Sequence, residues 1–198
     1  MNTVTIKESI QHWIAIREDA TSINQQFVQG NCFSYDVPSY IDTSEEVHVY
    51  PGVNEGQLYF FVIPAAYDKD EYSDVISDYT EVCPIQTIVG GGNDHEITSA
   101  EAQARILAWE NNYQTWVPQQ IATVDGMFEA FSVAVQDFET QKVVMTLGLK
   151  ESDKKGVYSA DLIVTNDMGN LVAYDDFTHP VPPYGSAAMA KESFYLLS

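Results

Sequence analysis

Basic side chains, cysteine and long apolar runs are all scarce in this sequence of 198 residues. Lysine and arginine together number 9, against 29 aspartates and glutamates, which gives a formal net charge of −20. Phosphate backbones and anionic lipid surfaces attract clustered positive charge, and no stretch of the chain concentrates lysine and arginine. We therefore expect neither nucleic-acid binding nor membrane binding.

Cysteine occurs only at Cys32 and Cys83, which form neither a C-x-x-C pair nor a disulfide framework. Reduced thiols in a cytoplasmic protein are the expectation, and a Cys32–Cys83 disulfide is the alternative. No apolar run approaches the roughly 18 residues that a membrane-crossing helix needs. The amino end carries Lys7 and Glu8 and lacks a long apolar core, so a secretory signal is not expected either.

Hydrophobic residues, by contrast, are plentiful: they make up 45% of the chain, and aromatic residues make up 12%. This composition is that of a globular protein, and the length allows a sizeable core. The acidic excess then has two interpretations. It serves solubility alone, or it forms a surface that engages a basic protein partner or cations.

Two stretches are typical of helix starts. "TIKE" at residues 5–8 and "TSAE" at residues 98–101 both have the Ser/Thr-x-x-Glu form of a capping box. Apolar residues follow each at helical spacing: Ile6, Ile10, Trp13 and Ile14 in the first case, and Ala102, Ile106, Trp109 and Tyr113 in the second. Pro118 should kink or stop the second helix, because proline lacks the amide donor.

The two helices indicate an internal duplication. One shift places Ile10 on Ile106, Trp13 on Trp109 and Gly52 on Gly148. With small changes of offset, "CFSYDVPSYI" then lies on "AFSVAVQDF", and "DYTEVCP" lies on "DFTHPVP". The alternative is that any two α+β halves share capped helices and apolar strands.

Each half reads as one helix followed by about three strands. Residues 128–135, 143–149, 158–165 and 171–177 are rich in β-branched and aromatic residues, and turn-like segments lie at 51–56, 151–156 and 166–170. Runs of hairpin-linked strands after a helix predict an α+β fold with antiparallel sheet. We expect two similar halves, residues 1–89 and 97–198, packed as one pseudo-symmetric domain.

A glycine-rich stretch at residues 90–96 should link the halves. It lacks the Gly-Lys-Ser/Thr ending of a P-loop and the G-x-G-x-x-G spacing of a dinucleotide fingerprint. Asp94, His95 and Glu96 offer metal-ligand chemistry, but adjacent loop residues rarely form a whole site. Residues 68–74 resemble a calcium loop at two positions only, since Ser73 stands where glycine is required. We therefore expect no metal and no cofactor.

Six residues are candidates for a ligand groove: His48, Tyr50, Asp78, Tyr79, Asp176 and His179. His48 and Tyr50 should share one face of a strand, because side chains alternate along it. The duplication gives Asp78-Tyr79 and Asp176 corresponding positions. The proline-rich segment from His179 to residue 185 cannot form a central strand. The alternative is that all six are structural, as turn caps, half-buried aromatics and an edge-blocking segment.

No catalytic motif, such as the G-x-S-x-G elbow, is present. The leading prediction is therefore a non-enzymatic binding or protein-interaction module, with a basic protein partner or self-association. The alternative is a small-molecule enzyme or carrier with a pocket between the two halves. A structural or storage role is a third hypothesis.

Overall fold

The computed structural model describes residues 1–42, 45–87, 97–152, 154–169, 171–184 and 191–198. The helices within these ranges are α1 (Thr3–Ile16), α2 (Ala20–Phe27) and α3 (Ser99–Ile121). The strands are β1 (Cys32–Asp36), β2 (Glu46–Asn54), β3 (Gln57–Pro64), β4 (Glu81–Pro84), β5 (Ala130–Ala134), β6 (Lys142–Glu151), β7 (Tyr158–Asp167), β8 (Val172–Asp175) and β9 (Thr178–Val181).

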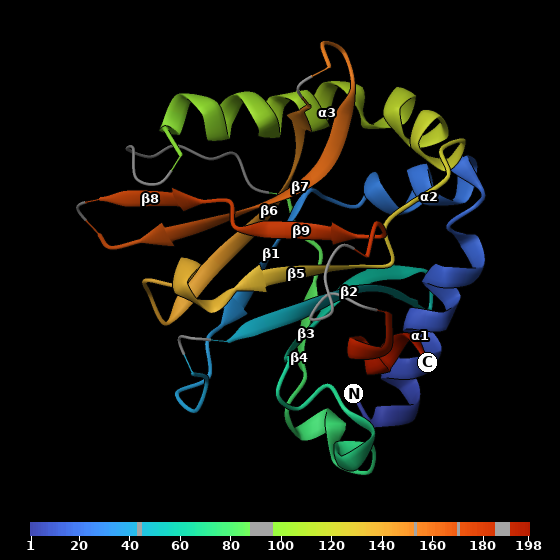
Figure 1. Ribbon diagram of the computed structural model, residues 1–198, viewed down its shortest axis with the longest axis vertical. Helices are drawn as coiled ribbons and strands as arrows, with labels where there is room; N and C mark the ends of the chain where they lie inside the picture. Colours follow the sequence, from blue (N-terminus) through green and yellow to red (C-terminus); the bar gives the residue numbers. More distant parts are fainter. Residues whose placement is uncertain (43–44, 88–96, 153, 170, 185–190) are drawn as a thin grey trace.

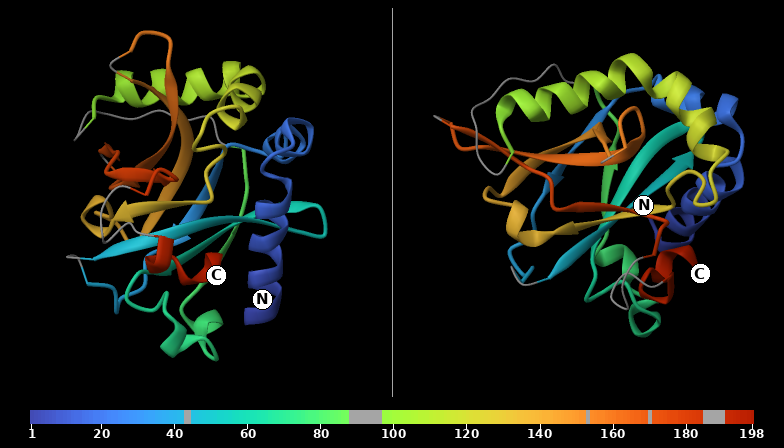
Figure 2. Two further views of the ribbon diagram at one scale, coloured as in Figure 1. Left: turned by 45° about the vertical axis from the view of Figure 1, so that its right-hand side comes forward. Right: turned by 45° about the horizontal axis from the view of Figure 1, so that its top comes forward.

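The strands form two antiparallel sheets, with the orders β1-β6-β7-β8 and β4-β3-β2-β5-β9 (Figure 1). The fold is therefore α+β with antiparallel sheet, as predicted. Helix α3 packs on β6 of the first sheet, and α1 packs on β2 of the second (Figure 2). Within the described residues, no helix is both long enough and apolar enough to cross a membrane.

Alternation along the strands creates separate cores on the two faces of each sheet. Phe60 and Val62 of β3 belong to the main core. Alternate residues from the strands of both sheets form this core. Phe61 and Ile63 point the other way, into a second core with α1 and the C-terminal segment. Ile163 of β7 packs outward in the same manner, against Ala102 of α3. The layers therefore run helix, sheet, sheet, helix.

The start of α1 differs from the prediction. Asn2, and not Thr5, is the N-cap: its Oδ1 accepts a hydrogen bond from the Thr5 amide at 2.9 Å. Asparagine is the better cap, so the helix begins earlier than the "TIKE" pattern predicts. The second prediction is confirmed, since Thr98 Oγ1 accepts from the Glu101 amide at 3.1 Å.

Pro118 does not stop α3, which continues to Ile121. Proline at this position leaves the Gln114 carbonyl without its usual helical donor. Asn24 Nδ2, on α2, donates to that carbonyl at 3.4 Å. A neighbouring helix thus supplies a donor that the sequence of α3 itself cannot provide.

The predicted turn at residues 51–56 is too long, because β2 continues to Asn54. Glu55 and Gly56, with φ of 50° and 80°, make the reversal alone. Pro51 is tolerated in the strand because the β2–β5 pairing ends at Val49 and Phe131. Beyond that point β2 pairs with β3 only.

The predicted strand at 171–177 is present as β8, which ends at Asp175, and the next residues cross between the sheets. Strand β8 pairs with β7 in the first sheet, and β9 pairs with β5 at the edge of the second. An edge position is what Pro180 requires, as the sequence predicted. The first half also contains more than predicted, namely the short helix α2 capped by Asp19, and four strands.

In both sheets, a strand from one half of the chain pairs with a strand from the other half. Strand β1 pairs with β6, so that Phe33 lies opposite Met145. Strand β5 pairs with β2, so that Phe131 lies opposite Val49. The helices approach the sheets over glycines: a Cβ on Gly52 would lie 3.0 Å from α1 backbone atoms, and one on Gly148 would lie 3.3 Å from the Cβ of Arg105.

The cysteines are free and buried, so the Cys32–Cys83 disulfide is ruled out in this structure. Burial raises the pKa of the Cys83 thiol, which keeps it protonated. Neither cysteine lies at the site described next.

Candidate functional site

The centre of the candidate site is the buried carboxylate of Asp68, which is 1% exposed. His48 Nδ1 lies 2.6 Å from its Oδ2, and the Tyr50 hydroxyl donates to the same oxygen. The Leu196 amide donates to Oδ1 at 3.2 Å. These contacts compensate for removing the carboxylate from water. Burial and the Asp68 charge raise the pKa of Tyr50 well above its ordinary value, so its hydroxyl remains a donor.

The C-terminal segment, residues 191–198, closes one side of this site. The Phe194 ring stacks on His48 with a centroid separation of 4.1 Å and an interplanar angle of 25°. Phe194 and Leu196 are buried in the second core. Next to them, the Lys7 ammonium lies 4.0 Å from the centroid of the Tyr195 ring. Distant parts of the chain therefore meet at His48.

A pocket of about 620 Å³ opens beside His48, and we call it the His48 pocket. Its lining residues are Glu45, Glu46, His48, Ala65, Ala66, Asp68, Lys69, Asp70, Glu192, Ser193 and Tyr195. Five of these are carboxylates, whereas Lys69 is the single lysine or arginine among the lining residues. The pocket has the size of a small-molecule site and a strongly negative wall.

His48 has one nitrogen engaged and one without a partner. It is 2% exposed and lines the pocket, and its Nδ1 contacts Asp68. Among the described residues, its Nε2 has no hydrogen-bond partner. When neutral His48 donates its Nδ1 proton to Asp68, Nε2 carries a lone pair that can accept a hydrogen bond. The wall of the pocket thus contains an imidazole nitrogen that has no partner among the described residues.

The sheet register places His48 and His179 in one row. Ser132 of β5 lies opposite His48 on one side and opposite His179 of β9 on the other. Two strand spacings separate the histidines, which is about 10 Å. The Ser132 hydroxyl donates to Glu46, and His179 is exposed outside the pocket lining. The row is shared, but only His48 reaches the pocket.

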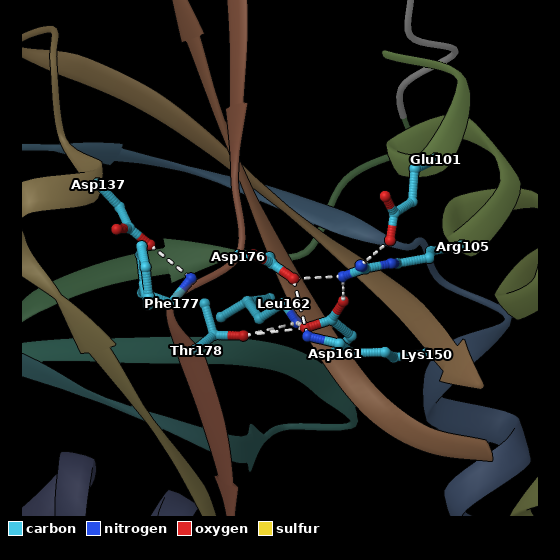
Figure 3. A network of polar contacts seen from close by, with 9 residues as sticks. All are labelled: Glu101, Arg105, Asp137, Lys150, Asp161, Leu162, Asp176, Phe177 and Thr178. Carbon is cyan, nitrogen blue, oxygen red and sulfur yellow. Dashed lines mark hydrogen bonds and ion pairs between the residues drawn. The ribbon is translucent and has the colours of Figure 1, made fainter. Parts of the chain in front are cut away.

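Asp176 belongs to a different cluster, between α3 and the first sheet (Figure 3). Arg105 Nη1 lies 2.8 Å from Asp161 and 2.5 Å from Asp176, and its Nη2 contacts Glu101. Lys150 Nζ lies 2.9 Å from Asp176. Each carboxylate here contacts a basic group, so the cluster offers no free charge to a ligand.

The electrostatics of this cluster follow from that pairing. Burial alone would raise the pKa of Asp176, but hydrogen bonds and charges from Lys150 and Arg105 outweigh it and lower the pKa. Burial lowers the pKa of Arg105, and its hydrogen bonds to Asp176, Glu101 and Asp161 reverse that and raise it. Both groups therefore remain charged.

Neighbouring contacts show what the cluster does. Thr178 donates to Asp161 at 3.1 Å, and Asp137 accepts from the Phe177 amide at 3.0 Å (Figure 3). Residues 176–178 are where the chain leaves the first sheet for the second. The cluster therefore holds this crossing and is structural.

Asp78 and Tyr79 lie in a third place, at the end of a 3₁₀ turn, Ile76–Asp78. Asp78 is exposed, and Tyr79 stacks on Tyr67 with a centroid separation of 3.9 Å. Tyr40 and Tyr72 pack edge-on against the same pair. The structure thus brings together His48 and Tyr50 only, out of the six candidates.

Sequence reasoning missed Asp68, Glu46 and Phe194. Asp68 stands in the acidic stretch 68–74, where the pattern pointed to calcium and not to a histidine. Within the described residues, no group of three or more histidine, cysteine or acidic residues is arranged to hold a metal ion. Asp94, His95, Glu96 and the linker lie outside the described residues.

Comparison of the chain with protein-family models, with curated proteins and with solved structures finds no match. The fold and the site therefore define a class only: an α+β protein with two antiparallel sheets and an acidic pocket around a buried His–Asp pair.

Proposed function

We propose that this protein is a non-enzymatic binding protein that takes a positively charged group into the His48 pocket. The observation that carries the proposal is the imbalance of charge in the lining, where five carboxylates face one lysine. A cation entering such a pocket is attracted by the whole wall, and it loses less hydration energy than it would in an apolar cavity.

Ser132 and the two cysteines are engaged or buried away from the His48 imidazole, which favours binding over catalysis. Ser132 lies opposite His48, but its hydroxyl donates to Glu46. The cysteines are buried away from the lining. A nucleophile normally contacts its base. We further infer a cytoplasmic location, which free thiols support.

The proposal is tested by titrating the protein with a short lysine-rich peptide at low and at high salt. We expect binding that weakens steeply with salt. The double variant Glu45→Gln/Glu192→Gln should lose that binding. The control Glu8→Gln/Glu55→Gln, which changes the net charge equally outside the pocket, should keep it. Equal losses in both variants would contradict a specific pocket.

A second candidate function rests on the Asp68–His48 contact. A histidine oriented by a carboxylate, with Nε2 unpartnered, has the arrangement of a general base. A small-molecule enzyme is favoured over binding alone if the wild type converts a bound ligand into a new product and His48→Gln does not.

We also propose that the two halves arose by internal duplication. Two strand pairings support the proposal, since Phe33 lies opposite Met145 and Phe131 lies opposite Val49. Helices α1 and α3 approach the sheets over Gly52 and Gly148. Superposition of the halves in an experimentally determined structure tests the proposal, and a mismatch of helix position or strand order would remove it.

A further inference from the structure

Four carboxylates line the His48 pocket besides Asp68: Asp70 and Glu192 are exposed, and Glu45 and Glu46 are partly buried. Among the described residues, no basic side chain forms an ion pair with Glu45, Glu46, Asp70 or Glu192. Asp161 and Asp176 contact Arg105, and Glu129 contacts Arg17. Like charges gathered without a counter-charge repel one another, so a bound cation would stabilise this arrangement.

The net charge of the pocket lining limits the class of ligand that could neutralise it. Asp68 is already engaged by His48, Tyr50 and the Leu196 amide. The remaining four carboxylates and Lys69 leave a net charge of about −3 in the lining. One lysine or arginine side chain of a partner would neutralise only a third of it. A flexible small molecule with several ammonium groups could neutralise all of it.

Two further observations fit ammonium groups. His48 is 2% exposed, and its Nε2, which has no partner among the described residues, can accept a hydrogen bond from an ammonium when it carries the lone pair. Tyr195, also in the lining, has the Lys7 ammonium 4.0 Å from its ring centroid, so an aromatic ring of the lining already contacts an ammonium of this chain. The volume of about 620 Å³ admits an extended aliphatic chain.

We propose that the ligand of the His48 pocket is a linear aliphatic polyamine with about three positive charges, held by Glu45, Glu46, Asp70 and Glu192 and by His48 Nε2. This inference rests on the proposed function and specifies its ligand. The chain between the ammonium groups would lie along Ala65 and Ala66, the two alanines of the lining.

The experiment is a calorimetric titration of the full chain with spermidine, putrescine and n-butylamine, which carry three, two and one ammonium groups, at one ionic strength. We expect affinity to rise about fivefold or more with each added ammonium. Glu45→Gln/Glu192→Gln should weaken spermidine binding about tenfold or more, and Glu8→Gln/Glu55→Gln should change it less than about twofold. Thermal unfolding of both variants checks that each is folded.

The outcomes separate this inference from the proposed function. Binding of the lysine-rich peptide without binding of spermidine would overturn the polyamine and keep the cation pocket. Equal affinity for spermidine and n-butylamine, or displacement of spermidine by an equal concentration of Mg²⁺, would also overturn it, since charge spacing would then have no role. Absence of binding by the peptide and all three amines would overturn both.

Discussion

Asp68 shows how a single residue organises the site. Its carboxylate lies within hydrogen-bonding distance of His48, Tyr50 and the Leu196 amide, which come from β2 and from the end of the chain. Such a carboxylate is costly to bury alone and stabilising once its partners are in place. The position of His48 in the pocket therefore depends on a residue outside its own strand.

Asp68→Asn tests this dependence. The asparagine amide would place an N–H donor against groups that now donate hydrogen bonds to the carboxylate. The free energy of unfolding should therefore fall by roughly 2–4 kcal/mol. Urea denaturation measures it. Asp70→Asn, an exposed neighbour in the same lining, is the control and should change stability by less than about 0.5 kcal/mol. Similar values for the two variants would show that the Asp68 contacts are not stabilising.

The two glycines under the helices make a second prediction at this scale. A Cβ on Gly52 would lie 2.6 Å from the Phe61 ring and 3.0 Å from the backbone of Ser9 and Ile10. A Cβ on Gly148 would meet the flexible end of Ile163 at 3.1 Å. Backbone cannot move aside as a side chain can, so Gly52→Ala should cost roughly 1–3 kcal/mol and Gly148→Ala less. Thermal unfolding of the two variants measures the two losses of stability. A larger loss for Gly148→Ala than for Gly52→Ala would contradict the placement of α1 over Gly52.

At the scale of elements, the Arg105 cluster joins α3 to the crossing between the sheets. Lys150 and Arg105 lower the pKa of Asp176 below its ordinary value of 3.8, despite burial. A carboxyl group with a lowered pKa in the folded state contributes its stability fully above the ordinary value. That contribution is lost as the pH falls through the folded pKa.

We therefore predict that wild-type stability falls as the pH drops below about 4, and that Asp176→Asn is less stable at pH 7 but has a shallower acid slope. Urea denaturation between pH 3 and pH 7 measures both. Asp78 is exposed and has no ion pair among the described residues, so Asp78→Asn should follow the wild type. Parallel curves for wild type and Asp176→Asn would exclude the ion pairs as the cause.

At the scale of the whole molecule, one folded chain contains 29 acidic and 9 basic residues. Their mutual repulsion destabilises the compact state, and salt screens it. The melting temperature at pH 7 should therefore rise by several degrees between about 10 mM and 300 mM NaCl. Near the isoelectric point of about 4.2 the same step in salt should have a much smaller effect. A salt response of equal size at both pH values would point to a cause other than net charge.

Much of the secondary structure could be predicted, because its determinants are local. The Thr98 cap, the buried stripe of Ile6, Ile10 and Trp13, and the edge position of Pro180 all follow from spacing and backbone chemistry. The features that could not be predicted are also informative. Pro118 remains inside a helix that α2 contacts at Gln114, and no pattern within α3 could indicate that.

The candidate site could be predicted only in part. His48 and Tyr50 share a face because strands alternate, and this was visible in the sequence. The contacts of His48 with Asp68 and Phe194 could not be predicted. They join residues far apart in the sequence, and they depend on how the sheets, the helices and the C-terminal segment pack. The sequence alone does not distinguish Asp176 from Asp78 as a ligand-binding carboxylate. In the structure, Asp176 has Arg105 and Lys150 beside it, and Asp78 does not.

The sequence by itself determined the composition of the surface, the helix starts, the hairpins and the α+β class, because these depend on charge count and on residues within a few positions of one another. Only the tertiary structure decided the exchange of β1 and β5 between the halves, the pairing of Asp161 and Asp176 with Arg105, and the gathering of unpaired carboxylates around His48. The physical reason is that the energy of a charge depends on its neighbours in space, and those are set by the packing of the whole chain.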